Sequence, residues 1–165
     1  MEFSGKKEKM KKAYELAYEH DERYGSCPQC VLAAVHEVLN VGDEDLIKAA
    51  HGLAGGGGLA LDGTCGALAG GIIAISSVYG RERKDFGKRK CLKSYLLAKE
   101  LHDRFVDKYD SPICEKVQEK IMGRSFDFWD EAQVEEFKKA NTGKCPDVAG
   151  NVAKWTVDIL LKEQK

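Results

Sequence analysis

The 165-residue sequence has no excess of charge of either sign. It contains 26 Lys and Arg residues and 27 Asp and Glu residues, which gives a formal net charge of -1. A basic excess would favour a polyanionic partner, and an acidic excess would indicate a solvating tail. We therefore expect no nucleic-acid partner.

The first residues do not show the pattern of a secretory leader. Residues 1–12 are mostly Lys and Glu, without the apolar stretch and small-residue cleavage site of a signal peptide. We therefore expect a cytoplasmic protein. Because cytoplasmic thiols are kept reduced, the six cysteines are interpreted as metal ligands, redox thiols or buried small side chains rather than as a disulfide framework.

Long hydrophobic runs are scarce, and the one candidate is residues 63–80, which carry no charge over 18 positions. This length reaches the lower limit for a membrane span. Its five glycines dilute its hydrophobicity, and Asp62 and Arg81 bracket it. We favour a buried core helix over a membrane span and expect no membrane association.

No segment has the alternating pattern of a strand, and no internal repeat is present. Apolar residues recur at helical spacing instead. We predict one all-α domain over residues 1–165, a compact bundle of about six to eight helices with a glycine-rich loop at Gly55–Gly58. The predicted helices cover residues 6–24, 27–40, 44–51, 65–79, 92–109, 111–121, 130–140 and 145–161, and the fourth, the least polar, is expected at the centre of the core.

Four cysteines stand where helices are expected to begin. The three prolines of the chain lie beside cysteines, in Cys27-Pro28, Cys145-Pro146 and the segment 111–114, and proline favours the first helical turn. The fourth cysteine follows Asp62 and Thr64, either of which can cap a helix. The four are Cys27, Cys65, Cys114 and Cys145.

A cysteine in the first turn of a helix lies near unpaired amide hydrogens and the positive end of the helix dipole. Such a thiol can titrate at about 3.5 to 7.5 instead of about 8.5, so we expect thiolates here. Taken singly, each cysteine is more often a buried packing residue. Cys30 forms a CxxC pair with Cys27 or simply packs, and Cys91 is assigned to packing.

These residues resemble a bacterial and archaeal family named for its cysteine pattern, C_GCAxxG_C_C, whose members are described as redox-active. The resemblance covers most of the chain, and its most specific part is the block Gly63-Thr64-Cys65-Gly66-Ala67-Leu68-Ala69-Gly70. Residues 27–32, Cys114-Glu115 and Cys145-Pro146 supply the other pieces. Cys30 stands where the family usually has a small residue, and Cys91 has no counterpart.

The family is in turn similar to the non-haem part of split-Soret cytochrome c, a dimeric helical protein with an iron-sulfur centre. This analogy implies an iron-sulfur cluster, with 2Fe-2S favoured over 4Fe-4S, and a homodimer that could meet through the glycine-lined fourth helix. The implied cofactor-binding residues are Cys27, Cys65, Cys114, Cys145 and Gly66. Covalent haem is not implied, since attachment needs CxxCH and Val31 follows Cys30.

Three functions remain open at this point. The first is an electron carrier or redox sensor with a cysteine-ligated cluster, and the second is a thiol-disulfide oxidoreductase in which Cys30 resolves the disulfide. The third is a zinc-stabilised interaction domain, which we place last because zinc ligands usually come in closely spaced pairs. His51, beside the glycine loop, is a further residue to test as a ligand. The other three histidines are expected to be solvated or hydrogen-bonded within the protein.

Overall fold

The computed structural model describes residues 5–88 and 91–164. This part of the chain contains eight α-helices and no strand, which confirms the all-α prediction. The α-helices are α1 (Lys6–Tyr24), α2 (Cys27–Leu39), α3 (Glu44–Ala49), α4 (Gly66–Tyr79), α5 (Leu92–Tyr109), α6 (Cys114–Met122), α7 (Glu131–Ala140) and α8 (Lys144–Lys162), and the 3₁₀ segments are η1 (His51–Gly56) and η2 (Arg83–Asp85).

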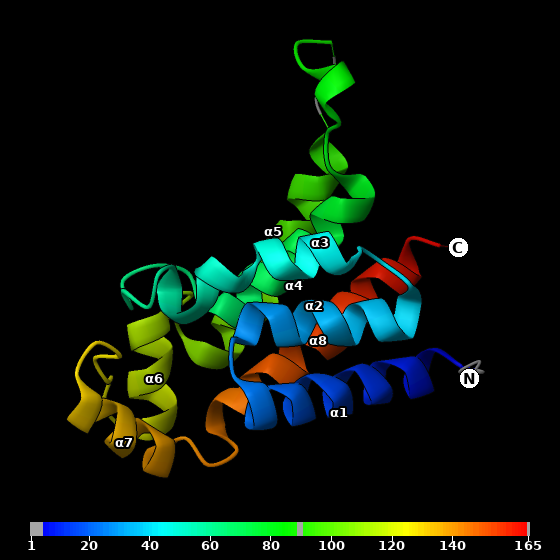
Figure 1. Cartoon of the computed structure of the whole chain (residues 1–165). Helices are drawn as coiled ribbons and strands as arrows, with labels where there is room; N and C mark the ends of the chain where they lie inside the picture. The colour runs from blue at the N-terminus through cyan, green and yellow to red at the C-terminus, as the bar shows by residue number, and fades with distance from the viewer. Residues whose placement is uncertain (1–4, 89–90, 165) are drawn as a thin grey trace.

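The core is built around α8 more than around α4, which the sequence placed at the centre. Helix α8 packs against α1 along most of its length and also against α2 and α4. Its apolar residues Val152, Val157 and Leu160 are essentially inaccessible to solvent. Helices α1, α2 and α8 run side by side through the body (Figure 1), while α6 and α7 lie at one end of it.

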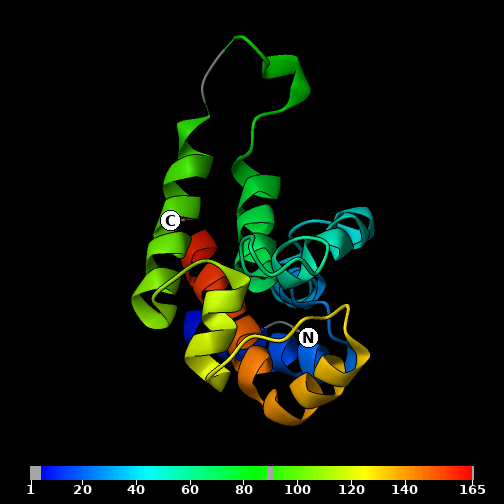
Figure 2. The ribbon, with the colours of Figure 1, turned by 90° about the vertical axis from the view of Figure 1, so that its left-hand side faces the viewer.

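Helices α4 and α5 run next to each other and extend beyond the body as a projecting arm (Figure 2). The arm comprises residues 76–88 and 91–96, which are the last turn of α4, the segment around η2 and the first turns of α5. The opposite end of α4 lies in the body, where its first residues are buried. One helix therefore connects the arm to the region in which the cysteines gather.

The glycines of α4 allow close packing inside the chain. A Cβ atom on Gly70 would lie 2.6 Å from the Pro28 carbonyl oxygen, and one on Gly71 would lie 2.6 Å from Leu101 Cδ2. These glycines thus let α4 approach α2 and α5. The expectation that this glycine face meets a second chain is wrong, because α2, α5 and α8 already cover it.

Aspartate side chains cap two of the helices, whereas the predicted cap of α4 is wrong. Asp43 accepts a hydrogen bond from the Leu46 amide at the start of α3, and Asp130 does the same for Ala132 and Gln133 in α7. Neither Asp62 nor Thr64 caps α4, whose N-cap is Cys65. Among the described residues, none of the helices has the length and apolar character that a membrane crossing requires.

Candidate functional site

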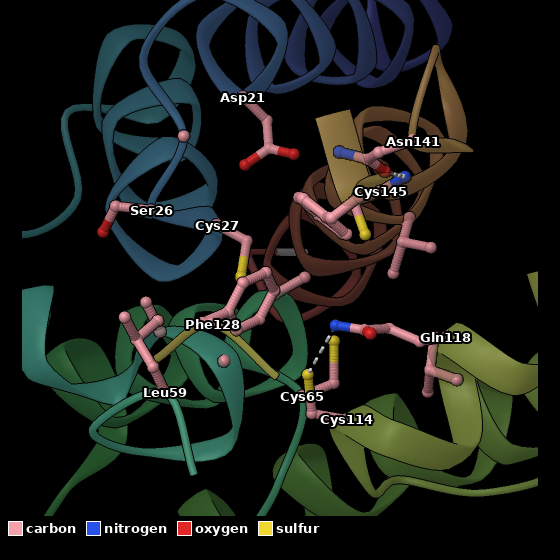
Figure 3. A pocket seen from close by; sticks show the side chains of 17 residues that line it. Asp21, Ser26, Cys27, Leu59, Cys65, Cys114, Gln118, Phe128, Asn141 and Cys145 are labelled. Carbon is pink, nitrogen blue, oxygen red and sulfur yellow. Dashed lines mark hydrogen bonds between the residues drawn. The ribbon is translucent and has the colours of Figure 1, made fainter. Parts of the chain in front are cut away.

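The four cysteines singled out from the sequence line one cavity. The cavity has a volume of roughly 190 Å³ and lies where α2, α4, α6 and α8 begin. Cys27 and Cys114 are the first residues of α2 and α6, Cys65 is the N-cap of α4, and Cys145 is the second residue of α8. Figure 3 shows their side chains around the same space. The fold thus brings together residues that are spread over most of the chain.

Cys65 and Cys114 are held side by side by backbone hydrogen bonds. The Cys65 amide donates to the Pro112 carbonyl at 2.7 Å, and the Cys114 amide donates to the Gly63 carbonyl at 2.9 Å. These bonds surround an isolated antiparallel bridge between Thr64 and Ile113. Pro112 therefore precedes α6 instead of opening it, contrary to the sequence prediction, and its carbonyl serves this bridge.

Cys27 approaches the start of α4 because residue 66 has no side chain. A Cβ atom built on Gly66 would lie 2.6 Å from Cys27 Sγ and 2.8 Å from Pro28 Cδ. Even a methyl group would therefore displace this sulfur or the start of α2. Gly66 makes room for a cysteine, which is a more specific role than the sequence indicated.

Cys145 is positioned by the connection between α7 and α8. Its amide donates a hydrogen bond of 2.8 Å to Asn141 Oδ1, and Asn141 also lines the cavity. Gly143, with a φ of 67°, adopts the left-handed conformation at the N-cap of α8. The turn therefore directs the fourth cysteine toward the other three.

The predicted lowering of the thiol pKa values is wrong for all four cysteines. Burial raises the pKa of Cys65 to about 11 and that of Cys114 to about 12. It also raises the pKa values of Cys27 and Cys145 well above the usual value, and negative charge on neighbouring cysteines adds to this. Desolvation outweighs the helix ends here, so these thiols are neutral near pH 7 when no cation is bound.

Two of the sulfurs accept hydrogen bonds from nearby groups. The amides of Ala67 and Leu68 donate to Cys65, which lowers its pKa by less than burial raises it. The Gln118 amide nitrogen lies 3.8 Å from Cys114 Sγ, while Gln118 Oε1 accepts from the Phe126 amide at 3.0 Å. The second bond fixes which end of the Gln118 side chain faces the sulfur.

Amides of the glycine loop donate hydrogen bonds to carbonyls of the same segment. Gly57 donates to the carbonyls of Leu53 and Ala54, and Gly58 donates to Gly52. These donors are therefore used within the loop. Gly55 is buried and lines the cavity, so the loop forms part of the cavity wall.

Asp21 is a cavity residue that the sequence analysis missed. It lies on α1 with its carboxylate toward the cysteines (Figure 3), and no described residue donates a hydrogen bond to it. Burial, with help from Glu22, raises its pKa to about 6. Asp21 follows the buried Ala13 and Ala17 at four-residue intervals, so helical spacing alone could have placed it on the inner face.

Aromatic and apolar side chains cover the cavity on the side of α7. Phe128 and Phe137 meet edge to face with ring centroids 4.8 Å apart, and both line the cavity together with Leu59. No sequence signal pointed to this cover, because Phe128 lies in an irregular segment before α7. The cover limits the access of water to the sulfurs.

The remaining candidate residues lie outside the cavity lining. Cys30 is buried, but its thiol donates to the Gly25 carbonyl at 2.9 Å. Cys91 lies at the start of α5 in a groove of the arm, outside the main hydrophobic core. His51 is exposed. None of these three joins the four cysteines.

The sulfurs are not arranged around a single ion. Within residues 5–88 and 91–164, no three Cys, His, Asp or Glu side chains form a group that could hold one metal ion. A tetrahedral zinc site would need Zn–S distances of about 2.3 Å and hence sulfurs within about 4 Å of one another. As they stand, the four side chains do not form a shell of sulfurs around one ion.

The comparison with curated proteins finds no match to this chain, and the comparison with solved structures finds none either. The comparison with protein families does find one. Residues 24–159, a range that includes all four cavity cysteines, match the family described as "Putative redox-active protein (C_GCAxxG_C_C)". The match spans most of the sequence and agrees with the resemblance drawn from the cysteine pattern, so the chain belongs to this family of redox-active proteins.

Proposed function

We propose that the protein binds an iron-sulfur cluster through Cys27, Cys65, Cys114 and Cys145 and uses it for electron transfer or redox sensing. The observation that carries the proposal is the convergence of these four side chains on one cavity. Four cysteine thiolates are the ligand set of both 2Fe-2S and 4Fe-4S clusters.

The charge balance of the cavity supports a cationic occupant. Four thiolates beside Asp21 would repel one another in a buried space, and their raised pKa values reflect this cost. Bound metal cations lower the pKa of a thiol enough to remove its proton. The same side chains are therefore neutral thiols without metal and suitable ligands with it.

The residues around the cysteines have roles that suit such a centre. A cluster would supply one-electron chemistry, with a potential set by hydrogen bonds to its sulfurs, local charge and solvent exposure. Here Ala67 and Leu68 donate to the Cys65 sulfur, and Gln118 faces Cys114. Phe128 and Phe137 keep water away from one side.

Metal-free thiol chemistry is the less favoured alternative. A nucleophilic cysteine needs a lowered pKa and an electropositive setting. In this cavity burial raises the thiol pKa values, and the charged side chain among the lining residues is the acidic Asp21. Cys30, the expected resolving thiol, does not line the cavity, and its thiol donates a hydrogen bond to the Gly25 carbonyl.

A visible spectrum of anaerobically purified protein separates the two functions. We expect broad absorption from sulfur-to-iron charge transfer that weakens when dithionite is added and returns on oxidation. A colourless protein that changes its number of free thiols reversibly between reduced and oxidised forms would support thiol-disulfide chemistry instead.

Gly66→Ala is expected to reduce cofactor binding strongly while leaving the helical fold intact. The new methyl group would lie 2.6 Å from Cys27 Sγ, so the sulfur must move away from its position. Gly52→Ala is the matched control, because nothing lies within 4 Å of its added Cβ. Iron content and far-ultraviolet circular dichroism of both variants check the prediction, and equal iron in the two would contradict it.

A further inference from the structure

Three large apolar side chains are exposed outside the arm in the described part of the chain. Each of them directly adjoins, in the sequence, a residue that lines the cysteine cavity. The exposed apolar surface of the body therefore lies around this cavity. The neighbouring pairs are Tyr24 with Gly25, Leu53 with Ala54, and Trp129 with Phe128.

The side chain of Phe128 separates the cavity from the surface beside Trp129. Phe128 lines the cavity, and it also lines an outer groove together with Trp129, Glu131, Val134 and Glu135. We call this outer groove the Trp129 groove. Figure 3 shows the Phe128 ring among the cavity side chains. A centre held by the cysteines therefore lies behind one aromatic side chain at this point.

Trp129 is 76% exposed, which is the largest value among the large apolar side chains described, but its backbone is fixed. Its amide donates to Asp127 Oδ1 at 2.8 Å, and the Asp127 amide donates to Gln133 Oε1 at 3.0 Å. The Asp130 carboxylate, one residue further on, caps α7. This turn holds the indole ring at a defined place on the surface. Tryptophan is enriched among the few residues that dominate the energy of protein interfaces.

The segments around the cavity are net negative, although the chain as a whole carries only -1. Residues 19–24 and residues 44–62 each carry three acidic side chains and one Lys or Arg. Residues 124–139 carry five acidic and three basic side chains. Helix α6 and residues 143–148 are balanced. The excess charge on this end of the molecule is therefore acidic.

The acidic excess is concentrated next to Trp129. In residues 124–139, Arg124 pairs with Glu136 and Lys138 pairs with Glu135. Residues 125–137 contain no Lys or Arg, and three acidic side chains lie within two positions of Trp129. They are Asp127, Asp130 and Glu131. A negative surface of this kind attracts a partner with a basic surface and speeds their encounter.

The apolar area of the Trp129 groove suits a transient partner better than a permanent one. A tryptophan side chain offers about 150 to 250 Å², whereas each partner of a stable interface buries about 800 Å². Complexes between redox proteins lie at the small end of interface sizes. One exposed indole ring with acidic neighbours therefore has the composition of a redox docking site.

We propose that the Trp129 groove is the docking site of a one-electron redox protein with a basic surface, and that the electron crosses at Phe128. The inference rests on the proposed cluster. In the transfer, the reduced cluster is oxidised by one electron and the partner is reduced by one, without bond formation or proton transfer. The acidic neighbours of Trp129 orient the partner, and the indole ring provides the apolar contact.

The test uses two electron acceptors of opposite charge with the full chain. The reduced protein is mixed with oxidised cytochrome c, a basic haem protein, or with ferricyanide, a small anion that needs no docking site. We expect Trp129→Ala to slow the reaction with cytochrome c by about tenfold or more, as for a central interface residue, and to leave the ferricyanide reaction unchanged. The wild-type rate with cytochrome c is expected to fall as salt is added, because salt screens the attraction.

Tyr95→Ala is the matched control, because Tyr95 is 72% exposed but belongs to the arm. We expect it to react with both acceptors as wild type does. Three results would overturn the docking site: a Trp129→Ala rate with cytochrome c equal to that of wild type, a wild-type rate that does not fall with salt, and equal slowing toward both acceptors, which would place the effect on the centre itself.

The visible spectrum of each sample separates this inference from the proposed function. A wild type without cluster absorption would overturn both of them. Normal absorption together with unchanged cytochrome c rates in Trp129→Ala would overturn the docking site alone and leave the cluster in place.

Discussion

Cys65→Ser is expected to lose most of its iron and the visible absorption that depends on it. The serine hydroxyl keeps the size of the thiol but is a far weaker ligand for iron. Cys65 also has the most interactions within the cavity, since its sulfur accepts from the Ala67 and Leu68 amides and its backbone pairs with Pro112. Cys30 does not replace Cys65 as a ligand, because the Cys30 thiol donates a hydrogen bond to the Gly25 carbonyl.

Cys91→Ser is the matched control for this prediction. Cys91 also precedes a helix as its N-cap, but it lies on the arm and does not line the cavity. We expect this variant to retain wild-type iron and absorption. Equal losses in both variants would indicate a general effect of removing a cysteine, and equal retention would remove Cys65 from the site. Iron analysis and absorption after anaerobic purification measure both outcomes.

Asp21→Asn is expected to raise the reduction potential of the bound centre. A negative charge beside a cluster opposes the arrival of an electron, and the Asp21 carboxylate faces the cavity without a hydrogen-bond donor among the described residues. A charge interaction of about one to two kcal/mol in this environment corresponds, for one electron, to a rise of about 40 to 90 mV. Voltammetry measures it, with Glu22→Gln as the control, because Glu22 is exposed on the same helix.

The same variant is expected to stabilise the cofactor-free protein. The pKa of Asp21 is about 6 in the fold against 3.8 for the unperturbed group, so the folded state holds this proton more tightly than the unfolded chain. Native stability therefore falls as pH rises from about 4 to about 6, and the cost above pH 6 is at most about 3 kcal/mol. The neutral asparagine side chain avoids this cost, so the gain over wild type grows with pH over that range.

Denaturant unfolding of the cofactor-free proteins at pH 4 and pH 7 measures this gain. We expect a larger difference between Asp21→Asn and wild type at pH 7. A variant that is less stable at pH 7 and leaves the potential unchanged would show that Asp21 serves packing alone. The combination of lower stability and a specific electrostatic effect is expected of a functional residue.

Much of the helical arrangement followed from sequence because its signals are local. Proline beside Cys27 and Cys145 marked the starts of α2 and α8, and apolar periodicity located the longer helices. The start of α6 was predicted too early, at residues 111–112. The Pro112 carbonyl instead accepts a hydrogen bond from the Cys65 amide, a contact between segments far apart in the chain. Local pattern carries no information about such a partner.

The site was predicted in its cysteines but not in its environment. The family pattern and the helix starts both selected the four residues that line the cavity. The direction of the thiol pKa shift was wrong, because burial depends on how α1, α7 and the glycine loop close around the sulfurs. Asp21 was missed because it is one of many charges on an amphipathic helix, although its four-residue spacing from the buried Ala13 and Ala17 places it on the inner face.

The amount of iron and acid-labile sulfide per chain, in protein purified without oxygen, tests the cluster itself. We expect equal amounts of the two, about two of each for a 2Fe-2S centre or about four for a 4Fe-4S centre. About one zinc per chain without sulfide, or no metal with all six thiols free to titrate, would contradict a cysteine-ligated cluster in this cavity.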